Sequence, residues 1–448
     1  MSAIPQNIAY KESGIPWVGK IPEHWEMRRV KHIARKIIGG GTPDTSVSSH
    51  WATEKKDSYL WVSIEDITKS NFIRDTKKYI TKSGLESSSA KIIPPFSILY
   101  SIYASLGKIA YSDLPVTTNQ AILAIQPQDN LFYKFLFYFL HSTTRDIITL
   151  SSMTTQNNIS LFVVQNLKIP LPPLQEQKAI ADFLDKKTHQ IEEFITKKQK
   201  LIALLEEKKQ TLINQCVTQG LDSSTSLKDS GVEWIGKIPT HWEVKKLKLL
   251  FGIGSGLGIT KADFVPSGIP CVSYGEIHSK YPCRLNTGIH PLPYVSEDYL
   301  SSKPQALLKK GDFVFADTSE DIEGSGNFTS LQSDDPVFAG YHTIVLKPKT
   351  QSIHSPYFSF LFDSLGIRNQ VRKEVCGVKV YSITKSILKE VQCLIPPLEE
   401  QKAIAEYLDT QIEKIDLAIC KIKSQINLIK EYKTTLIPKA VCGRVEIN

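Results

Sequence analysis

The sequence has few cysteines, no long apolar run and only a small excess of positive charge. The seven cysteines are odd in number, lie far apart and form no Cys-x-x-Cys pair, so we predict neither a disulfide framework nor a zinc site. The longest dense apolar run, residues 132–140, is too short to cross a bilayer and contains a lysine. The N-terminal residues lack a basic and then apolar leader, so we expect a cytoplasmic protein without a membrane partner.

The net charge of +8 over 448 residues is too small to bind nucleic acid by charge alone. What the chain does contain is an internal repeat. Residues 11–26 return as residues 228–243 with 11 of 16 positions identical, and residues 173–185 return as residues 397–409 with 10 of 13 identical. The segments between these blocks have diverged. A length that suggests about three domains is therefore better explained by a shared scaffold that presents two different surfaces.

The second repeated block begins a long helix in each copy, because prolines precede it and a carboxylate lies in its first turn. Apolar residues then recur with the spacing of a coiled-coil seam. The seam residues are Leu184, Ile191, Ile195, Ile202, Leu205 and Leu212 in the first copy, and Leu408, Ile412, Ile415, Ile419, Ile422, Ile426, Ile429 and Leu436 in the second. We expect these helices, each of about 40 residues, to pack against each other. Separate burial of each helix on its own domain is the alternative.

The diverged regions are typical of mixed α and β structure. Strands are expected at residues 59–64, 97–103 and 121–125 in the first region, and at 271–274, 312–316 and 343–346 in the second. Apolar, aromatic stretches at 131–140 and 357–365 are expected to be helices. Residues 217–228 are rich in Ser, Thr, Gly and Asp, which favours a linker between the halves.

Several fragments imitate enzyme motifs without the residues that the chemistry needs. Residues 14–20 and 231–237 have the spacing of a phosphate-binding loop, but isoleucine follows the lysine where Mg²⁺ binding needs Ser or Thr. The glycine-rich run 251–258 fails the Gly-x-Gly-x-x-Gly register. An acid-and-lysine pattern at 43–56 fits a metal-dependent nuclease only loosely. We therefore predict a binding protein with no catalytic residue, metal site or cofactor of its own.

The chain resembles, over essentially its full length, the specificity subunit of type I restriction-modification systems. The match is carried by Gly-x-Ile-Pro-x-His-Trp at 19–25 and 236–242, and by the Ile-Pro stretches that lead into Glu-Gln-Lys-Ala-Ile at 169–180 and 395–404. The resemblance implies an α+β fold in which two mixed α/β target recognition domains are joined and separated by two long antiparallel coiled-coil helices, with a pseudo-twofold internal repeat.

The repeat and the resemblance together predict six segments. They are the N-terminal repeated block at 1–26, target recognition domain 1 at 27–172, the central long helix at 173–215, a linker with the second repeated block at 216–243, target recognition domain 2 at 244–396, and the C-terminal long helix with its tail at 397–448. In the first domain the glycine-rich segment at 39–43 fits the family pattern. The corresponding segment of the second domain, 254–261, departs from it.

The resemblance further implies that each domain reads one half of a bipartite, asymmetric DNA site. The partners would be double-stranded DNA, two adenine-specific methyltransferase subunits docked on the long helices, and a restriction and translocase subunit. S-adenosylmethionine, ATP and Mg²⁺ would be bound only by those partner subunits. Two alternatives remain open: a coiled-coil adaptor that does not recognise DNA, and a self-sufficient nuclease.

Candidate DNA contacts follow from residue chemistry, since Arg and Lys suit guanine and phosphate, Asn and Gln suit adenine, and hydroxyls suit phosphate. In the first domain they are Thr42, Lys69, Arg74, Ser101, Ser105, Lys108, Asn119 and Gln120. In the second domain they are Lys261, Tyr274, Lys280, Arg284, Ser319, His342, Lys379 and Tyr381. We expect roughly one in three to touch DNA, with contacts to phosphate outnumbering those to bases. Residues 101–108 and 119–120 are favoured.

Overall fold

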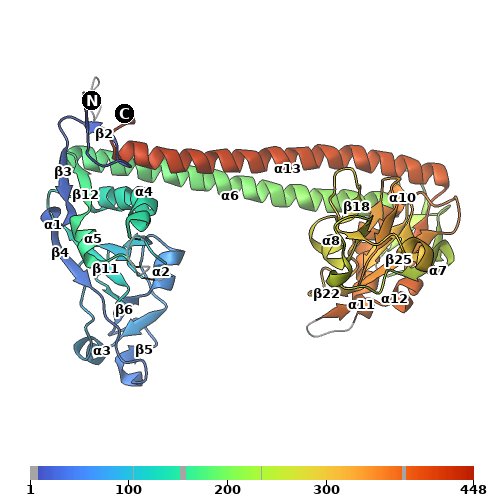
Figure 1. Cartoon of the computed structure of the whole chain (residues 1–448), viewed down its shortest axis with the longest axis horizontal. Helices are drawn as coiled ribbons and strands as arrows, with labels where there is room; N and C mark the ends of the chain where they lie inside the picture. The colour runs from blue at the N-terminus through green and yellow to red at the C-terminus, as the bar shows by residue number, and fades with distance from the viewer. Residues whose placement is uncertain (1–8, 104, 152–157, 234, 376–379, 448) are drawn as a thin grey trace. The chain divides into compact units, whose positions relative to one another are not determined.

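The computed structural model describes residues 9–103, 105–151, 158–233, 235–375 and 380–447 (Figure 1). The chain forms two compact units, one of residues 1–198 with 423–448 and the other of residues 199–422. Each unit contains one of the two diverged regions, one copy of both repeated blocks and a part of each long helix.

The first unit is built on two four-stranded sheets. Its strands are β1 (Tyr10–Glu12), β2 (Lys20–Pro22), β3 (Glu26–Arg29), β4 (Ala34–Gly39), β5 (Trp51–Ala52), β6 (Tyr59–Val62), β7 (Lys78–Ile80), β8 (Ile98–Ser101), β9 (Ile109–Tyr111), β10 (Thr117–Thr118), β11 (Ile122–Pro127) and β12 (Lys168–Leu171). Its shorter helices are α1 (Val30–Ile33), α2 (Ile64–Lys69), α3 (Lys82–Glu86), α4 (Tyr133–Ser151) and α5 (Leu161–Asn166). The sheet orders are β4-β11-β8-β9, which is antiparallel, and β10-β6-β7-β5, in which β10 runs parallel to β6.

Strand β11 is the centre of the first unit, because both of its faces are buried. Leu123 and Ile125 join the core that contains α4, whereas Ile122 and Ala124 join a second core with residues of β6. This alternation is what the period of two along a strand requires. The sheet is therefore covered by α4 on one face and by the β6 sheet on the other (Figure 1).

The second unit repeats this plan with a five-stranded sheet in place of one of the four-stranded sheets. Its strands are β13 (Leu227–Asp229), β14 (Lys237–Pro239), β15 (Glu243–Lys246), β16 (Phe251–Ser255), β17 (Ile269–Val272), β18 (Cys283–Leu285), β19 (Tyr294–Val295), β20 (Leu307–Leu308), β21 (Phe313–Ala316), β22 (Thr318–Ser319), β23 (Phe328–Leu331), β24 (Val337–Ala339), β25 (Thr343–Pro348), β26 (Tyr381–Ser382) and β27 (Gln392–Ile395). Its shorter helices are α7 (Leu247–Leu250), α8 (Tyr274–Ser279), α9 (Tyr299–Ser302), α10 (Ser355–Asp363), α11 (Leu365–Glu374) and α12 (Lys385–Glu390). The larger sheets have the orders β16-β25-β21-β23-β18 and β19-β17-β24-β20.

The strands expected at 97–103, 121–125, 312–316 and 343–346 are confirmed as β8, β11, β21 and β25. The strands expected at 59–64 and 271–274 end earlier, at Val62 and Val272, because a helix begins directly after the next serine. The backbone N–H of Ser63 donates to Asp66, and that of Ser273 donates to Glu276, so each serine starts a helical turn.

The two long helices are α6 (Leu174–Gln219), of 46 residues, and α13 (Leu398–Val441), of 44 residues. Helix α6 continues beyond the predicted boundary at 215 and covers the first residues of the expected linker. It ends where Gly220 adopts a φ of +75° and donates its N–H to the carbonyl of Cys216 (3.1 Å). This left-handed conformation ends many helices and favours glycine.

Within each unit the long helices pack side by side in opposite directions. In the first unit Leu184 shares a core with Leu436, and further along α6 Glu192 Oε1 lies 2.8 Å from Lys433 Nζ. In the second unit Lys209 Nζ lies 2.8 Å from Asp416 Oδ1. Each seam residue is at least partly buried: Leu184, Ile191, Leu408, Ile415, Ile419, Ile422, Ile426 and Leu436 are buried, and Ile195, Ile202, Leu205, Leu212, Ile412 and Ile429 are half-buried.

The two repeated blocks meet at the start of each long helix. Glu176 accepts a hydrogen bond from Trp25 Nε1–H at Oε2 (2.8 Å), and its Oε1 lies 2.9 Å from His24 Nε2. In the second copy Glu400 Oε2 accepts from Trp242 Nε1–H (3.1 Å) and lies 2.8 Å from His241 Nε2. The His-Trp motif is thus the anchor of its block, since both indoles are fully buried.

The glutamine after this glutamate holds the variable domain. The buried Gln177 amide accepts from Phe132 N–H (2.7 Å) and donates to the carbonyls of Asn130 (2.9 Å) and Pro172 (2.8 Å). In the second copy Gln401 accepts from His354 N–H (3.0 Å) and donates to the carbonyls of Ser352 (3.1 Å) and Pro396 (2.9 Å). One amide therefore fixes the segment before α4 or α10 to the long helix.

A carboxylate two turns further along each helix also binds its domain, but through different partners. Asp185 is paired with Lys134 and accepts from the Tyr138 hydroxyl (2.6 Å), both on α4. Its counterpart Asp409 is paired with Arg284 Nη2 (2.5 Å), which comes from β18. The carboxylate is thus present in both copies of the repeated helix, whereas the cation that pairs with it comes from a different element of each domain.

We expect Gln177→Leu to destabilise the first unit, because the N–H of Phe132 and the carbonyls of Asn130 and Pro172 lose the buried amide that binds them. At about 1–3 kcal/mol for each unpaired buried group and ~2–4 °C per kcal/mol for a unit of this size, Tm should fall by at least about 5 °C in scanning calorimetry. The matched control is Gln175→Leu, at an exposed position in the same helical turn. Equal changes in Tm for the two variants would contradict the role of Gln177.

Candidate nucleic-acid interface

The loop between β10 and β11, residues 119–121, forms what we term the first tip. Asn119 N–H donates to the Val62 carbonyl (3.1 Å), and Gly40 N–H donates to the Ile122 carbonyl (3.2 Å). A Cβ on Gly40 would lie 1.9 Å from the Asn119 carbonyl oxygen, so only glycine allows this approach. The glycine-rich segment at 39–43 therefore supports the first tip from beneath.

Three predicted DNA contacts meet at the first tip. The Thr42 hydroxyl donates to Gln120 Oε1, while Asn119 Oδ1 accepts from Ala121 N–H (3.2 Å) and is turned back onto its own loop. Gln120 is exposed, and Thr42 and Asn119 are half-buried. Of these side chains, Gln120 is the one that presents polar atoms outward.

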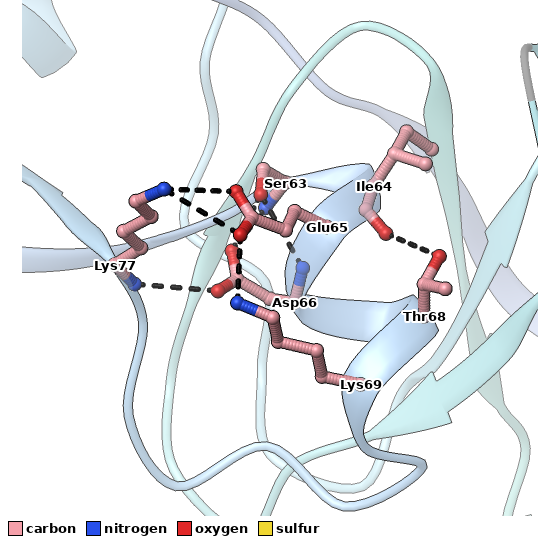
Figure 2. A network of polar contacts seen from close by, with 7 residues as sticks. All are labelled: Ser63, Ile64, Glu65, Asp66, Thr68, Lys69 and Lys77. Carbon is pink, nitrogen blue, oxygen red and sulfur yellow. Dashed lines mark hydrogen bonds and ion pairs between the residues drawn. The ribbon is translucent and has the colours of Figure 1, made fainter. Parts of the chain in front are cut away.

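Lys69, a further predicted contact, lies on α2, where it belongs to a network of charges (Figure 2). Glu65 binds Lys69 Nζ (2.6 Å) and Lys77 Nζ (3.2 Å), and Ser63 donates its hydroxyl to Asp66 Oδ2 (2.7 Å). Hydrogen bonds from Lys69 and then Lys77 lower the pKa of Glu65, and the bond to Glu65 raises the pKa of Lys69. Lys69 thus reaches the surface already paired with an acid of its own helix.

Ser101 is fully buried, which argues against the predicted contact with DNA. Its hydroxyl donates to the Ser105 carbonyl and accepts from Lys108 N–H (2.8 Å), so it closes the turn between β8 and β9. Ser105 is half-buried and Lys108 is exposed on this turn. Of the DNA contacts predicted at 101–108, Ser105 and Lys108 therefore remain candidates.

Arg74 lies on an exposed surface of the same domain. Its guanidinium carbon is 4.6 Å from the centre of the Phe72 ring, and Nη2 lies 3.2 Å from Asp113 Oδ2. The side chain is held over an aromatic face and keeps most of its surface open to a ligand.

The second tip, residues 340–342, has the same construction although its supporting segment differs in sequence. Gly256 N–H donates to the Thr343 carbonyl (3.1 Å), and a Cβ on Gly256 would lie 2.1 Å from the Gly340 carbonyl oxygen. His342 has a φ of +53°, an uncommon conformation for a non-glycine residue. Its Nδ1 lies 3.1 Å from Asp317 Oδ1.

A hollow of about 810 Å³ lies beside the second tip. Three predicted contacts, Tyr274, Ser319 and His342, line it together with other residues of α8, of β22 and of the loop 320–327. Tyr381 adjoins this wall, because β26 pairs with β22 and places Tyr381 opposite Ser319. The structure thus brings together four residues that are far apart in the sequence.

One wall of the hollow is fixed by residues that the sequence did not single out. His278 Nε2 lies 2.7 Å from the Thr318 carbonyl, which can only accept, so Nε2 carries the proton and Nδ1 accepts from Asn327 Nδ2–H (2.9 Å). Arg368 Nη1–H donates to Asn327 Oδ1 (2.9 Å). No motif links these residues, so only the folded domain reveals the chain of hydrogen bonds.

The remaining predicted contacts lie elsewhere. Arg284 lies under the long helix, paired with Asp409 and 4.9 Å from the Phe360 ring centre, so its guanidinium serves the scaffold and the placement does not support a DNA contact. Lys280 is 3.7 Å from Glu276 of its own helix, and Lys261 is exposed. Lys379 lies outside the described residues.

Among the described residues, no group of three or more His, Cys, Asp or Glu side chains is arranged to hold a metal ion. Within the same parts of the chain, none of the helices is long and apolar enough to span a membrane. Burial raises the pKa of the Cys271 thiol, on β17, to about 12, so this thiol stays neutral. The two tips offer exposed hydrogen-bonding side chains on rigidly supported loops, which suits recognition of a polar surface.

Comparison with known sequences finds specificity subunits of type I restriction enzymes. Type I restriction enzyme MjaVIII specificity subunit of Methanocaldococcus jannaschii is 26% identical over 438 residues, covering 96% of this chain and 95% of the relative. The EcoKI specificity subunit of Escherichia coli is 22% identical, covering 95% and 90%. The EcoR124I/EcoR124II specificity subunit of Escherichia coli is 30% identical over 192 residues, 40% of this chain and 43% of the relative.

Solved structures share the fold. One match is a chain in a structure of the type I R-M system that addresses its complex assembly and conformational transition. The TM-score is 0.72 at 18% identity, over 95% of this chain and 99% of that one. The HsdS subunit from Thermoanaerobacter tengcongensis matches with a TM-score of 0.57 at 17% identity, over 95% and 98%. The sequence profile of the Type I restriction modification DNA specificity domain matches twice, at residues 22–204 and 239–428. The chain therefore belongs to the type I restriction-modification DNA specificity family, with two specificity domains in tandem.

Proposed function

We propose that the chain is the DNA specificity subunit of a type I restriction-modification complex in the cytoplasm, and that each domain reads one half of a bipartite, asymmetric site. The observation that carries this proposal is that the two units support their tips in the same way but present different side chains on them. The supports of the tips are alike, down to the glycine beneath each one, whereas the side chains presented are Gln120 in one and His342 in the other. Two unlike readers on one type of scaffold suit two unlike half-sites.

The chemistry of the complex, in this proposal, lies in its partners. Methyltransferase subunits would bind S-adenosylmethionine and methylate adenine, and a restriction and translocase subunit would use ATP and Mg²⁺. The present chain would select the site and position the partners without taking part in a bond-making step. The exposed loops of the tips suit this division of labour, because reading DNA needs hydrogen-bond donors and acceptors at the surface.

The long helices supply a repeated docking surface for those partners. Leu204 on α6 and Leu428 on α13 are 51% and 65% exposed, and they occupy equivalent positions of the repeat, 224 residues apart. One lies in each unit. Exposed apolar residues at matched places suit two copies of one partner, so we infer two methyltransferase subunits per chain.

Methylation mapping tests the proposed function. In cells that carry the chain and its methyltransferase, we expect adenine methylation at one split motif whose two halves differ in sequence. Removal of the chain should abolish methylation at that motif, because the methyltransferase alone has no reader. An active methyltransferase whose sites are the same with and without this chain would overturn the proposal.

Charge substitutions on the helices test the docking surface. Leu204→Asp and Leu428→Asp should each remove one methyltransferase from the purified complex, and the double variant should remove both, as measured by light scattering after size exclusion. The matched controls are Glu206→Ala and Lys430→Ala, an exposed pair two residues further along each helix and therefore on another face. A double leucine variant that keeps both methyltransferases would contradict this docking surface.

A further inference from the structure

The first tip lies at the end of its sheet that is remote from the scaffold. Strand β11 begins directly after the tip, at Ile122, and ends at Pro127, so its six residues span about 20 Å. The other end leads to Asn130 and Phe132, which Gln177 of α6 holds. The Gln120 end is therefore free of the long helix and open to a ligand.

The Gln120 side chain is held in one orientation although it is exposed. The backbone of the loop is already fixed by the hydrogen bonds of Gly40 and Asn119, so the side chain is not needed to form the tip. The Thr42 hydroxyl donates to Gln120 Oε1 and leaves both amide N–H groups and one lone pair of Oε1 unused. An amide fixed in this way presents a donor and an acceptor side by side.

Adenine is the base that matches such a pair. In the major groove adenine presents the N7 acceptor next to the N6 amino donor, whereas guanine presents two acceptors, cytosine a donor and thymine an acceptor. A side-chain amide can therefore accept from N6 and donate to N7 of the same adenine. Guanine would leave the amide oxygen facing another acceptor, which is repulsive.

We propose that Gln120 reads the adenine of an A·T pair in the half-site of the first domain, and that Thr42 is the positioning residue that orients its amide. This assignment rests on the proposed function and adds the base and the side chain that reads it. The A·T pair is distinct from the one that is methylated, because the adenine that is methylated has to leave the base stack to enter the methyltransferase.

The second domain presents a different side chain one residue further along its tip. The position equivalent to Gln120 holds the half-buried Tyr341, and the exposed residue is His342. His342 is fixed by Asp317, as Gln120 is fixed by Thr42, but a ring replaces the amide. With Nδ1 facing the carboxylate, the imidazole offers a single nitrogen, Nε2, and lacks the paired donor and acceptor. The adenine preference therefore belongs to the first domain alone, and a change at His342 should affect the other half of the site.

The test is competition binding by the complex of this chain with its methyltransferase, using duplexes in which each base pair of the methylation motif is changed in turn. Gln120→Ala should lower the preference for one A·T pair by on the order of tenfold or more, and leave the preferences in the other half unchanged. Gln120→Glu, which retains only acceptors, should shift that position towards C, whose N4 amino group is a donor. His342→Ala should alter preferences only in the opposite half.

The control is Asn130→Ala, which removes an exposed amide three residues beyond the far end of β11 and should leave every preference unchanged. Thr42→Val should weaken discrimination at the same A·T pair as Gln120→Ala and at no other. A purely structural role for Gln120 would lower Tm and weaken all duplexes alike. If the wild-type complex discriminates a split motif and the Gln120→Ala complex discriminates it equally well, the role of Gln120 is overturned and the proposed function is not. Wild-type complex without sequence preference overturns the proposed function instead.

Discussion

The glutamate and glutamine at the start of each long helix are the contact on which the rest of the structure depends. Glu176 binds the buried tryptophan of the first repeated block, and Gln177 binds the backbone that leads into α4. Glu400 and Gln401 do the same in the second unit. Because the two indoles, Glu176 and both glutamines are buried, losing one of them would leave its partner short of a hydrogen bond in the core. The constraint explains why these short segments are nearly identical in two halves that otherwise differ.

A scaffold fixed in this way leaves the domains free to diverge. The acid at Asp185 or Asp409 accepts whichever cation its domain supplies, from α4 in one unit and from β18 in the other. The glycine under each tip is retained, whereas the residues presented above it are not. The repeated blocks and long helices, which hold the partners, are thus separate from the tips, which vary to read different sequences. The hollow beside the second tip and the charge network on α2 of the first domain are consistent with that separation.

The sequence predicts the repeated and periodic features well, because they are local. The seams of α6 and α13 follow from heptad spacing, and β11 and β25 follow from apolar runs between turns. The apolar pattern predicts ends of β6 and β17 that are two residues too late, since a serine with an acid three residues further on starts a helix there. Contacts such as Arg284 with Asp409, or His278 with Asn327, join residues that no spacing rule connects. The burial of Ser101 likewise depends on a turn that only the folded chain reveals.

On this model of recognition, the two tips are the parts of the chain that enter the DNA grooves. The most direct measurement is a cryo-EM structure of the chain with its methyltransferase on a duplex that carries the methylated motif. We expect residues 119–121 in the major groove of one half-site and residues 340–342 in that of the other, with the long helices contacting protein. A complex in which both tips face solvent, and another surface of each domain contacts the bases, would contradict it.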